Sequence, residues 1–492
     1  MTEDTLPDLL DRLTTGAGVT FEGEDLGVVR LDYRELTDRS RRVAGGLAAR
    51  GIGPGDRVLV HLPNCPDTIV LWFALARLRA IFVPTNITLT ARELAFAAAH
   101  SGASLAVARP ASAALLEEAG IEPALLVAGL DDLPQAEPPD VAPPRPEDPV
   151  ELVFTSGTTS APKAAVITHA NCVSSGRQKA EAMRVGPDDR LLSALPVVHV
   201  NAQSALLTAL DAGASFSLLG RYSASRYCEQ LAAHGATVTS LVGTQVRTLL
   251  RQEPGASDRA HGVRRAWFAL NVSDAERAAF EERFGIRLYN GYGLTEAFTS
   301  VTQVPLDGPD HWPCVGRPLR DRRVVILDEH GEELAAGEVG EIVVEGEPGR
   351  TLMAGYWRDP EATAATLRDG RLHTGDFGRL DEDGCLFFVE RKAHTIKRAG
   401  ENVAAGEVEN VLLGHPAVLE AAVVGVPDEL RDEAVKAFVV VSPGATVEEL
   451  AAYCAERLAP FKVPTLWSLE RELPRNALGK IEYRRLREGV AV

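Results

Sequence analysis

The sequence predicts an α/β protein: a large N-terminal domain of parallel α/β subdomains plus a β-rich subdomain, then a small α+β C-terminal domain. Two observations support this fold class. Before Val324, short apolar segments alternate with longer stretches rich in Ala, Leu, Arg and Glu, which is typical of βαβ units around a buried parallel sheet. From Val324 onward, glycine and acidic turns separate the apolar segments, which favours antiparallel strands.

In the N-terminal part, we expect buried strands at Arg57–His61, Ile81–Pro84 and Leu105–Ala108. Each is a short apolar run of the length that strands usually have. The stretches 36–49 and 91–100 have helical composition and fit between these strands as crossover helices.

In the C-terminal part, residues 324–328 and 340–345 read as antiparallel strands, and 380–389 as a hairpin with its turn at Asp383-Gly384. After Arg391 the pattern becomes α+β. We expect a domain boundary there, with a large domain at residues 1–391 and a smaller domain at 392–492. The elements expected in the smaller domain are a helix at 406–413, strands at 419–426 and 434–441, and a helix at 447–458.

The charge balance excludes some partners. The 492-residue chain carries a formal net charge of −18, so we expect no binding to nucleic acid through its net field.

The apolar run Ile69–Ala76 is followed closely by Arg77 and Arg79, so we expect no membrane insertion. The N-terminus Met1-Thr-Glu-Asp is acidic where a signal peptide would be basic, and we expect a cytoplasmic protein.

The segment Phe154-Thr-Ser-Gly-Thr-Thr-Ser-Ala-Pro-Lys163 is the most informative motif. A strand ending in such a loop presents backbone N–H groups, hydroxyls and one ammonium to the same point, as a polyphosphate requires. It lacks the second glycine and the Lys-Ser/Thr pair of a Walker loop. The residues expected to bind such a polyphosphate are Thr155, Ser156, Gly157, Thr158, Thr159 and Lys163.

A second motif, Asn290-Gly-Tyr-Gly-Leu-Thr-Glu296, combines the groups that a nucleotide and its metal need. The ring of Tyr292 can stack on a purine, and the hydroxyl of Thr295 can meet a phosphate. The carboxylate of Glu296 is an oxygen ligand suited to Mg²⁺. In His373-Thr-Gly-Asp376, the Asp376 carboxylate suits two vicinal ribose hydroxyls, although Thr-Gly-Asp alone is also an ordinary turn.

Five motifs in fixed order resemble those of the adenylate-forming superfamily, which contains acyl-CoA synthetases, luciferases and peptide-synthetase adenylation domains. They are the two motifs above, His373–Asp376, Glu390–Asn402 and Pro474–Ile481. Several local strings, among them Phe268-Ala-Leu-Asn-Val-Ser273 and Phe461-Lys-Val-Pro464, look most like carnitine/crotonobetaine-type CoA ligases.

The resemblance implies roles for further residues and a C-terminal domain that is mobile. Lys480 would bridge the attacking carboxylate and the α-phosphate, where negative charge accumulates in the transition state. His199 would flank the carboxylate of the acid, and it is also a candidate for a packed structural histidine. The other implied site residues are Asn290, Gly291 and Tyr292 at the adenine, Asp376 and Arg391 at the ribose, and Ala269, Leu270 and Asn271 at the acyl group.

Some positions depart from the superfamily pattern. The hinge residue, commonly Asp or Lys, is Ala393, and the Gly-Gly-Glu-Asn loop is Ala399-Gly-Glu-Asn402. In CoA-forming relatives this loop borders the pantetheine tunnel, so the extra methyl group at Ala399 bears on the choice of acceptor.

The sequence therefore predicts an AMP-forming ligase that uses ATP and Mg²⁺. A small carboxylic acid attacks the α-phosphate to give acyl-AMP and pyrophosphate, and a thiol, CoA in the leading reading, then takes the acyl group. One alternative is an adenylating enzyme with another acceptor: an amine, a carrier protein, or an aryl amine that attacks activated nitrite, as in secondary metabolism. Another is a degenerate nucleotide-binding protein. The identity of the acid and the oligomeric state, with a homodimer as one candidate, stay open.

Overall fold

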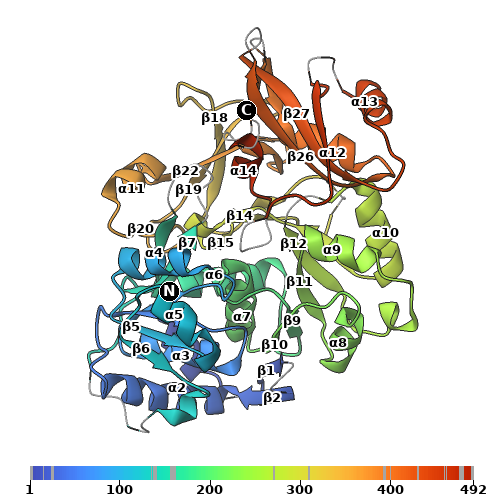
Figure 1. Cartoon of the computed structure of the whole chain (residues 1–492). Helices are drawn as coiled ribbons and strands as arrows, with labels where there is room; N and C mark the ends of the chain where they lie inside the picture. The colour runs from blue at the N-terminus through green and yellow to red at the C-terminus, as the bar shows by residue number, and fades with distance from the viewer. Residues whose placement is uncertain are drawn as a thin grey trace. The chain divides into compact units, whose positions relative to one another are not determined.

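The computed structural model (Figure 1) describes residues 4–14, 16–23, 27–133, 136, 141–155, 162–269, 272–308, 311–391, 395–398, 401–428, 432–458, 460, 462–475 and 481–488. These residues divide into two compact units. The first comprises the described parts of 1–155, 162–324 and 344–372, and the second those of 325–343 and 373–492. The domain boundary that we expect at Arg391 stays a prediction.

The first unit contains a seven-stranded sheet in the order β13-β12-β11-β9-β10-β1-β2. Every neighbouring pair is parallel except β1 and β2, which form an antiparallel hairpin at one edge. Parallel strands place their carboxyl ends at the same edge of a sheet, where ligands of α/β proteins bind. The strands are β1 (Gly18–Gly23), β2 (Gly27–Asp32), β9 (Arg190–Ser193), β10 (Ser215–Leu219), β11 (Val238–Val242), β12 (Arg265–Ala269) and β13 (Arg287–Asn290).

A second seven-stranded sheet of this unit has the order β20-β8-β7-β4-β3-β5-β6. The strands from β7 to β6 in this order are parallel, whereas β8 is antiparallel to both β7 and β20. The strands are β3 (Arg57–His61), β4 (Ile81–Pro84), β5 (Leu105–Ala108), β6 (Ala124–Leu126), β7 (Pro149–Thr155), β8 (Lys163–Thr168) and β20 (Gly355–Tyr356).

The helices of the first unit join these two sheets. Residues of α2, α3, α6 and α7 form one buried core with strands of both sheets, and α3 is buried along almost its whole length. The apolar run 69–76 is therefore part of a core helix. The helices are α1 (Leu6–Asp11), α2 (Tyr33–Ala48), α3 (Pro66–Arg77), α4 (Ala91–Ser101), α5 (Ala113–Glu118), α6 (His169–Ala182), α7 (Val200–Ala212), α8 (Tyr227–Ala233), α9 (Gly243–Leu250), α10 (Asp274–Phe284) and α11 (Pro360–Thr366).

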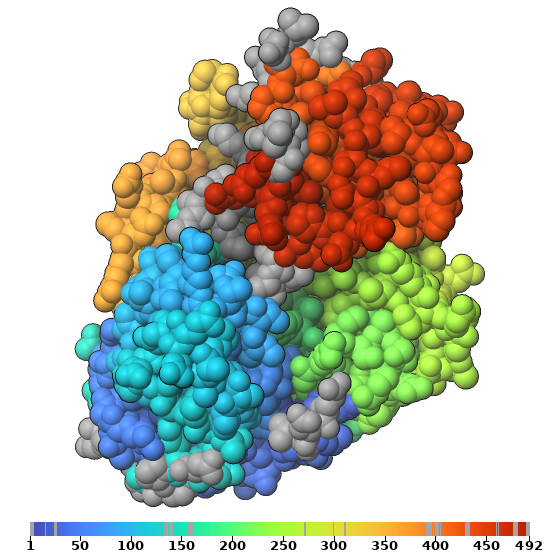
Figure 2. Space-filling model, in the orientation of Figure 1, coloured from blue at the N-terminus to red at the C-terminus, as the bar shows by residue number. Residues whose placement is uncertain are grey.

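Local sequence explains where several of these helices begin. At the start of α4, α6 and α10, the N-cap residues Thr90, Thr168 and Ser273 each accept a hydrogen bond from the backbone N–H three residues later. Such capping satisfies an N–H group that has no partner within the helix. The atoms of α4 and α5, light blue and cyan in Figure 2, form part of the outer surface of the first unit. Short strands also occur here: β14 (Gly293–Leu294), β15 (Thr299–Ser300), β16 (Thr302–Gln303), β17 (Arg317–Pro318) and β21 (Leu367–Arg368).

The remaining elements belong mainly to the second unit. A five-stranded sheet has the order β18-β19-β22-β21, with β23 paired to β22, and a further five-stranded sheet has the order β25-β24-β27-β26, with β28 paired to β27. The elements are β18 (Arg323–Leu327), β19 (Gly340–Glu345), β22 (Arg371–Leu380), β23 (Leu386–Arg391), β24 (Thr395–Arg398), β25 (Glu401–Ala404), α12 (Ala405–Leu413), β26 (Val418–Asp428), β27 (Asp432–Val441), α13 (Val447–Ala455), β28 (Leu466–Glu470) and α14 (Tyr483–Glu488).

The predicted fold class is confirmed: parallel α/β sheets lie in the N-terminal part, antiparallel strands follow near Val324, and an α+β region ends the chain. Among the described residues, no helix combines the length and the apolar character needed to cross a membrane.

Candidate active site

The turn that carries Glu296 follows the carboxyl end of β13. Asn290 ends that strand, and both Asn290 and Tyr292 are buried. Gly291 fits closely here, because a Cβ atom would lie 3.0 Å from the Thr302 carbonyl oxygen, a tighter contact than most Cβ atoms make. Two residues after Glu296, the buried Phe298 adopts a left-handed φ of 40°. Left-handed backbone at a bulky residue persists only where its surroundings impose it, so the turn that presents Thr295 and Glu296 is held firmly.

Three side chains from distant parts of the sequence meet in the first unit. The hydroxyl of Tyr356 donates a hydrogen bond to Glu296 Oε1 (2.7 Å). The Lys163 ammonium lies over the Tyr356 ring, 5.0 Å from its centroid. Tyr356 therefore links the cation of the phosphate-loop motif to the carboxylate predicted for Mg²⁺.

Backbone contacts hold this trio in place. Tyr356 on β20 pairs with Ala165 on β8, the strand that begins at Lys163. The Met353 N–H donates to the Glu296 carbonyl oxygen (2.7 Å). Burial and the neighbouring Glu296 carboxylate raise the pKa of the Tyr356 phenol well above its ordinary value, so it stays protonated and donates. The sequence analysis missed Tyr356, which lies on a two-residue strand that forms only by pairing with the distant β8.

The two ends of the phosphate-loop motif are described, and its centre is not. Thr155 ends β7 and pairs directly with Lys163 at the start of β8, so both lie at the mouth of the connecting loop. The predicted phosphate contacts Ser156, Gly157, Thr158 and Thr159 lie outside the described residues.

The candidate acyl segment, which we define as His199, Ala269, Leu270 and Asn271, follows the carboxyl ends of strands in one sheet. His199 precedes the first turn of α7, after β9, and Ala269 is the last residue of β12. Leu270 and Asn271 lie outside the described residues. The indole N–H of Trp267 donates to Asn201 Oδ1 (3.2 Å), which ties β12 to the start of α7 two residues beyond His199.

In the second unit, Asp376 on β22 and Arg391 on β23 are direct partners in the antiparallel register. The Asp376 side chain is only 2% exposed, and its backbone N–H donates to Thr374 Oγ1 (3.1 Å). The two predicted ribose residues thus lie side by side in one hairpin. Lys480 lies outside the described residues, and its flanking residues Arg475 and Ile481 form a β-bridge.

A buried lysine that the sequence analysis missed lies behind the Glu296 turn. Lys179 on α6 donates to Ser300 Oγ (2.7 Å) and Gln303 Oε1 (2.6 Å). Gln303 Nε2 in turn donates to the carbonyl oxygens of Tyr289 (3.0 Å) and Asn290 (2.8 Å). Burial lowers the pKa of Lys179 to about 7. The sequence carries no signal for this burial, since a lysine on a helix is usually solvated.

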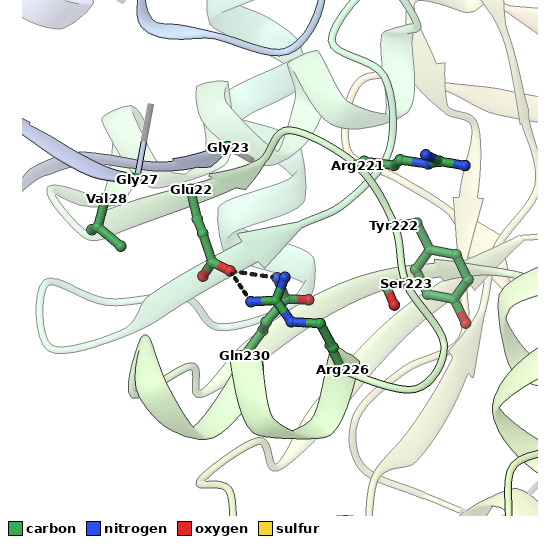
Figure 3. Close-up of a pocket in the computed structure, with 9 residues that line it drawn as sticks. All are labelled: Glu22, Gly23, Gly27, Val28, Arg221, Tyr222, Ser223, Arg226 and Gln230. Atoms are coloured by element: carbon green, nitrogen blue, oxygen red, sulfur yellow. Dashed lines mark hydrogen bonds and ion pairs between the residues drawn. The ribbon is translucent and has the colours of Figure 1, made fainter. Parts of the chain in front are cut away.

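A surface cavity of about 490 Å³ lies elsewhere in the first unit (Figure 3). It contains none of the predicted site residues. Its charged groups largely satisfy one another, since Glu22 accepts hydrogen bonds from Arg226 (3.0 Å) and Gln230 (2.7 Å) and contacts His234. Arg221 points away from this cluster (Figure 3). Because these groups bond to one another, the polar lining of the cavity does not by itself indicate a ligand.

Comparison with known proteins confirms the class predicted from sequence, an AMP-forming ligase. The AMP-binding enzyme family matches residues 20–357, and the AMP-binding enzyme C-terminal domain matches residues 407–480. The chain belongs to the AMP-binding enzyme family.

Individual relatives narrow the class. The chain is 39% identical over 485 residues to a crotonobetaine/carnitine–CoA ligase of Escherichia coli O8 (strain IAI1), covering 94% of each protein. Among solved structures, it resembles o-succinylbenzoate CoA synthetase (MenE) from Bacillus subtilis in complex with AMP, with a TM-score of 0.89, 28% identity, and coverage of 100% of this chain and 99% of that one. It also resembles ATP-bound MatB from Rhodopseudomonas palustris, with a TM-score of 0.88, 28% identity and 98% coverage of both chains.

These findings confirm the leading functional prediction. The protein is an ATP-dependent adenylate-forming ligase of the acyl-CoA synthetase type, which activates an acid as its acyl-adenylate and transfers the acyl group to the thiol of CoA.

Proposed function

We propose that Glu296, Tyr356 and Lys163 form the part of the active site that neutralises the triphosphate. The observation that carries this assignment is the Tyr356 hydroxyl, which donates to Glu296 while its ring lies beneath the Lys163 ammonium. Lys163 supplies the positive charge, Glu296 supplies a carboxylate oxygen, and Tyr356 fixes the orientation of that carboxylate.

The residues of the proposed site fit an Mg²⁺ ion whose ligands come mainly from the phosphates of the substrate. No group of three or more His, Cys, Asp or Glu side chains suited to a metal occurs among the described residues. Mg²⁺ commonly takes one or two protein carboxylates, with phosphate oxygens and water as its other ligands, and Glu296 meets that need. When bound, the ion neutralises charge on the phosphate oxygens.

The remaining predicted residues complete the proposed site. Asn290, Gly291 and Tyr292 lie at the adenine, Thr295 and the loop residues at the phosphates, and Asp376 with Arg391 at the ribose. Lys480 stabilises charge as the acid attacks the α-phosphate, and the candidate acyl segment surrounds the acid. Domain rotation then admits CoA for the second half-reaction.

The direct test is a screen for pyrophosphate release over a panel of small carboxylic acids, with and without CoA. We expect pyrophosphate release with at least one acid, and formation of a thioester when CoA is added. Glu296→Gln should lower the rate about 10²–10³-fold, the usual cost of losing an oriented charged group. A Glu296→Gln variant as active as the wild type would contradict the assignment.

The proposal places the reaction in the cytoplasm, where ATP and CoA are found, with a small-molecule acid as the partner. A role in secondary metabolism and assembly as a homodimer are further expectations. Size-exclusion chromatography with light scattering tests the homodimer.

A further inference from the structure

The side-chain amide of Asn64 joins the two large sheets of the first unit at their carboxyl edges. Asn64 lies between the end of β3 and the start of α3. Its Nδ2 donates to the carbonyl oxygens of Leu195 (3.0 Å) and Leu219 (2.9 Å), and its Oδ1 accepts from the Val197 N–H (2.8 Å). Leu219 ends β10, and Leu195 follows β9. One amide therefore holds two loops at the edge where ligands of α/β proteins bind.

The loop after β9 that Asn64 holds ends at His199. Two of the three hydrogen bonds of Asn64 flank Pro196. The Pro196 carbonyl oxygen accepts a hydrogen bond from the His199 N–H (3.0 Å). On its other side, the His199 carbonyl oxygen accepts from two N–H groups in the first turn of α7 (3.1 and 3.2 Å). The backbone of His199 is thus fixed by α7 on one side and by the turn that Asn64 holds on the other.

The chemistry of these three contacts specifies an amide. Two carbonyl oxygens need donors and one N–H needs an acceptor, and a planar amide supplies two donors and an acceptor from one side chain. An aspartate has the same shape, but its ionised carboxylate has no donor. Asn64 is also partly buried, so water replaces the lost contacts only in part.

We propose that Asn64 is a positioning residue, which fixes the backbone of His199 where that histidine flanks the carboxylate of the acid. The inference rests on the role of His199 in the proposed function. A displacement of about 1 Å at a reacting group can cost about 10²-fold in rate. The residues proposed for the triphosphate, Glu296 and Lys163, lie on other elements, after β13 and on β8. Loss of the amide should therefore impair the use of the acid and spare the binding of ATP.

Asn64→Asp keeps the shape of the side chain and replaces its two donors with repulsive contacts. For the acid of the panel that reacts fastest, we expect kcat/KM to fall at least about 10-fold. The dissociation constant of MgATP should stay within about 2-fold of the wild-type value. Protonation of the new carboxyl group restores one donor, so the ratio of variant to wild-type kcat/KM should rise as the pH falls. A parallel loss in ATP binding would show a general structural role and overturn the proposal.

Gln252→Glu is the matched control. The Gln252 amide also donates to a carbonyl oxygen, that of Thr248 (3.1 Å), but it lies beyond the last turn of α9, at the end of that helix away from β11. Both constants should be unchanged in this variant.

Combining Asn64→Asp with His199→Ala tests whether the amide acts through the histidine. If it does, Asn64→Asp should lower kcat/KM by less than about 3-fold in the His199→Ala background, because residues that act as a unit have non-additive effects. Fully additive losses would overturn the proposal.

Asn64→Ala gives a measurement that needs no substrate, and a second variant should the aspartate variant fail to fold. It removes the acceptor of the Val197 N–H, so we expect amide hydrogen exchange in residues 194–199 to become at least about 10-fold faster. Exchange in α9 should not change. An unchanged rate in residues 194–199 would overturn the proposal. Failure of the proposed function looks different, because His199→Ala would then keep wild-type kinetics while exchange in Asn64→Ala is still faster, and the positioning role would fall with it.

Discussion

At the scale of single residues, Tyr356 has two separable contacts. Its hydroxyl bonds to Glu296 and its ring supports Lys163. A phenol that donates to a carboxylate restricts the rotamers of that carboxylate, which matters when the same group must meet a cation. The hydroxyl and the ring can be removed one at a time.

Tyr356→Phe removes the hydroxyl and keeps the ring. We expect the Mg²⁺ concentration at half-maximal rate to rise about 5- to 20-fold, because hydrogen bonds to charged groups contribute about 1.5–3 kcal/mol and this site is only partly enclosed. Pyrophosphate release measured against Mg²⁺ concentration checks this. Tyr222→Phe is the control, since the Tyr222 hydroxyl bonds to Gln245 and Thr248, away from the predicted site residues. An unchanged Mg²⁺ response in Tyr356→Phe would remove the hydroxyl from the site.

At the scale of secondary structure elements, the close packing of α6 on α7 depends on one glycine. A Cβ atom at Gly176 would lie 2.5 Å from the Leu207 carbonyl oxygen, whereas one at Gly186 would meet nothing within 4 Å. Gly176 also lies one turn before Lys179, so a shift of α6 would move the lysine.

We expect Gly176→Ala to destabilise the protein by about 1–3 kcal/mol, the usual cost of overpacking. Thermal or urea denaturation of the two alanine variants measures the difference, with Gly186→Ala as the matched control. If Gly176→Ala unfolds at the wild-type midpoint, α6 and α7 are not held at the distance described.

A buried carboxyl group on β7 makes stability depend on pH. Glu151 is fully buried and accepts a hydrogen bond from Gln203 on α7 (2.6 Å). Burial raises its pKa from 4.5 to about 8. The folded state therefore holds a proton that the unfolded state releases, and the stability from protonated Glu151 is complete below about pH 4.5 and lost as the pH rises towards 8.

Glu151→Gln should flatten this dependence. We expect the wild type to lose a few kcal/mol of unfolding free energy, relative to the variant, between pH 5 and 8. Urea titrations of both proteins across that range check the sign. A wild-type protein that gains stability relative to Glu151→Gln as the pH rises would show that the carboxyl group is ionised in the fold.

The local sequence pattern was enough to predict many of the strands and helices. The strands expected at 57–61, 81–84 and 105–108 coincide with β3, β4 and β5, since each is a short apolar run bounded by polar or turn residues. Pattern was not enough for β20, whose two residues form a strand only by pairing with β8, far away in the sequence. Tyr356 was missed for that reason, and Lys179 because a lysine on a helix reads as a solvated residue until tertiary packing buries it.

At the scale of the whole molecule, the two half-reactions should respond to different residues. We expect Lys480→Ala to lower adenylation about 10²–10⁴-fold, because the role proposed for this lysine is to stabilise charge that develops in the transition state. ATP affinity should change little. Transfer of the acyl group from supplied acyl-adenylate to CoA should continue at the wild-type rate.

Rapid-quench measurement of each half-reaction separates these effects. A parallel loss in both half-reactions would point to misfolding, which circular dichroism detects, and an undiminished adenylation rate would remove Lys480 from the first step.

The register of Asp376 with Arg391 has a consequence for how this protein can vary. Because the two positions are opposite each other on adjacent strands of one hairpin, a shift of that hairpin would carry both away from the ribose that we propose they bind. Once either contact is lost, the other keeps little of its value, so the effects of substituting both should be markedly less than additive. In a mutational library the two positions should therefore vary together. Active variants would keep both residues, and variants that have lost one residue would lose little more activity when the other is also replaced.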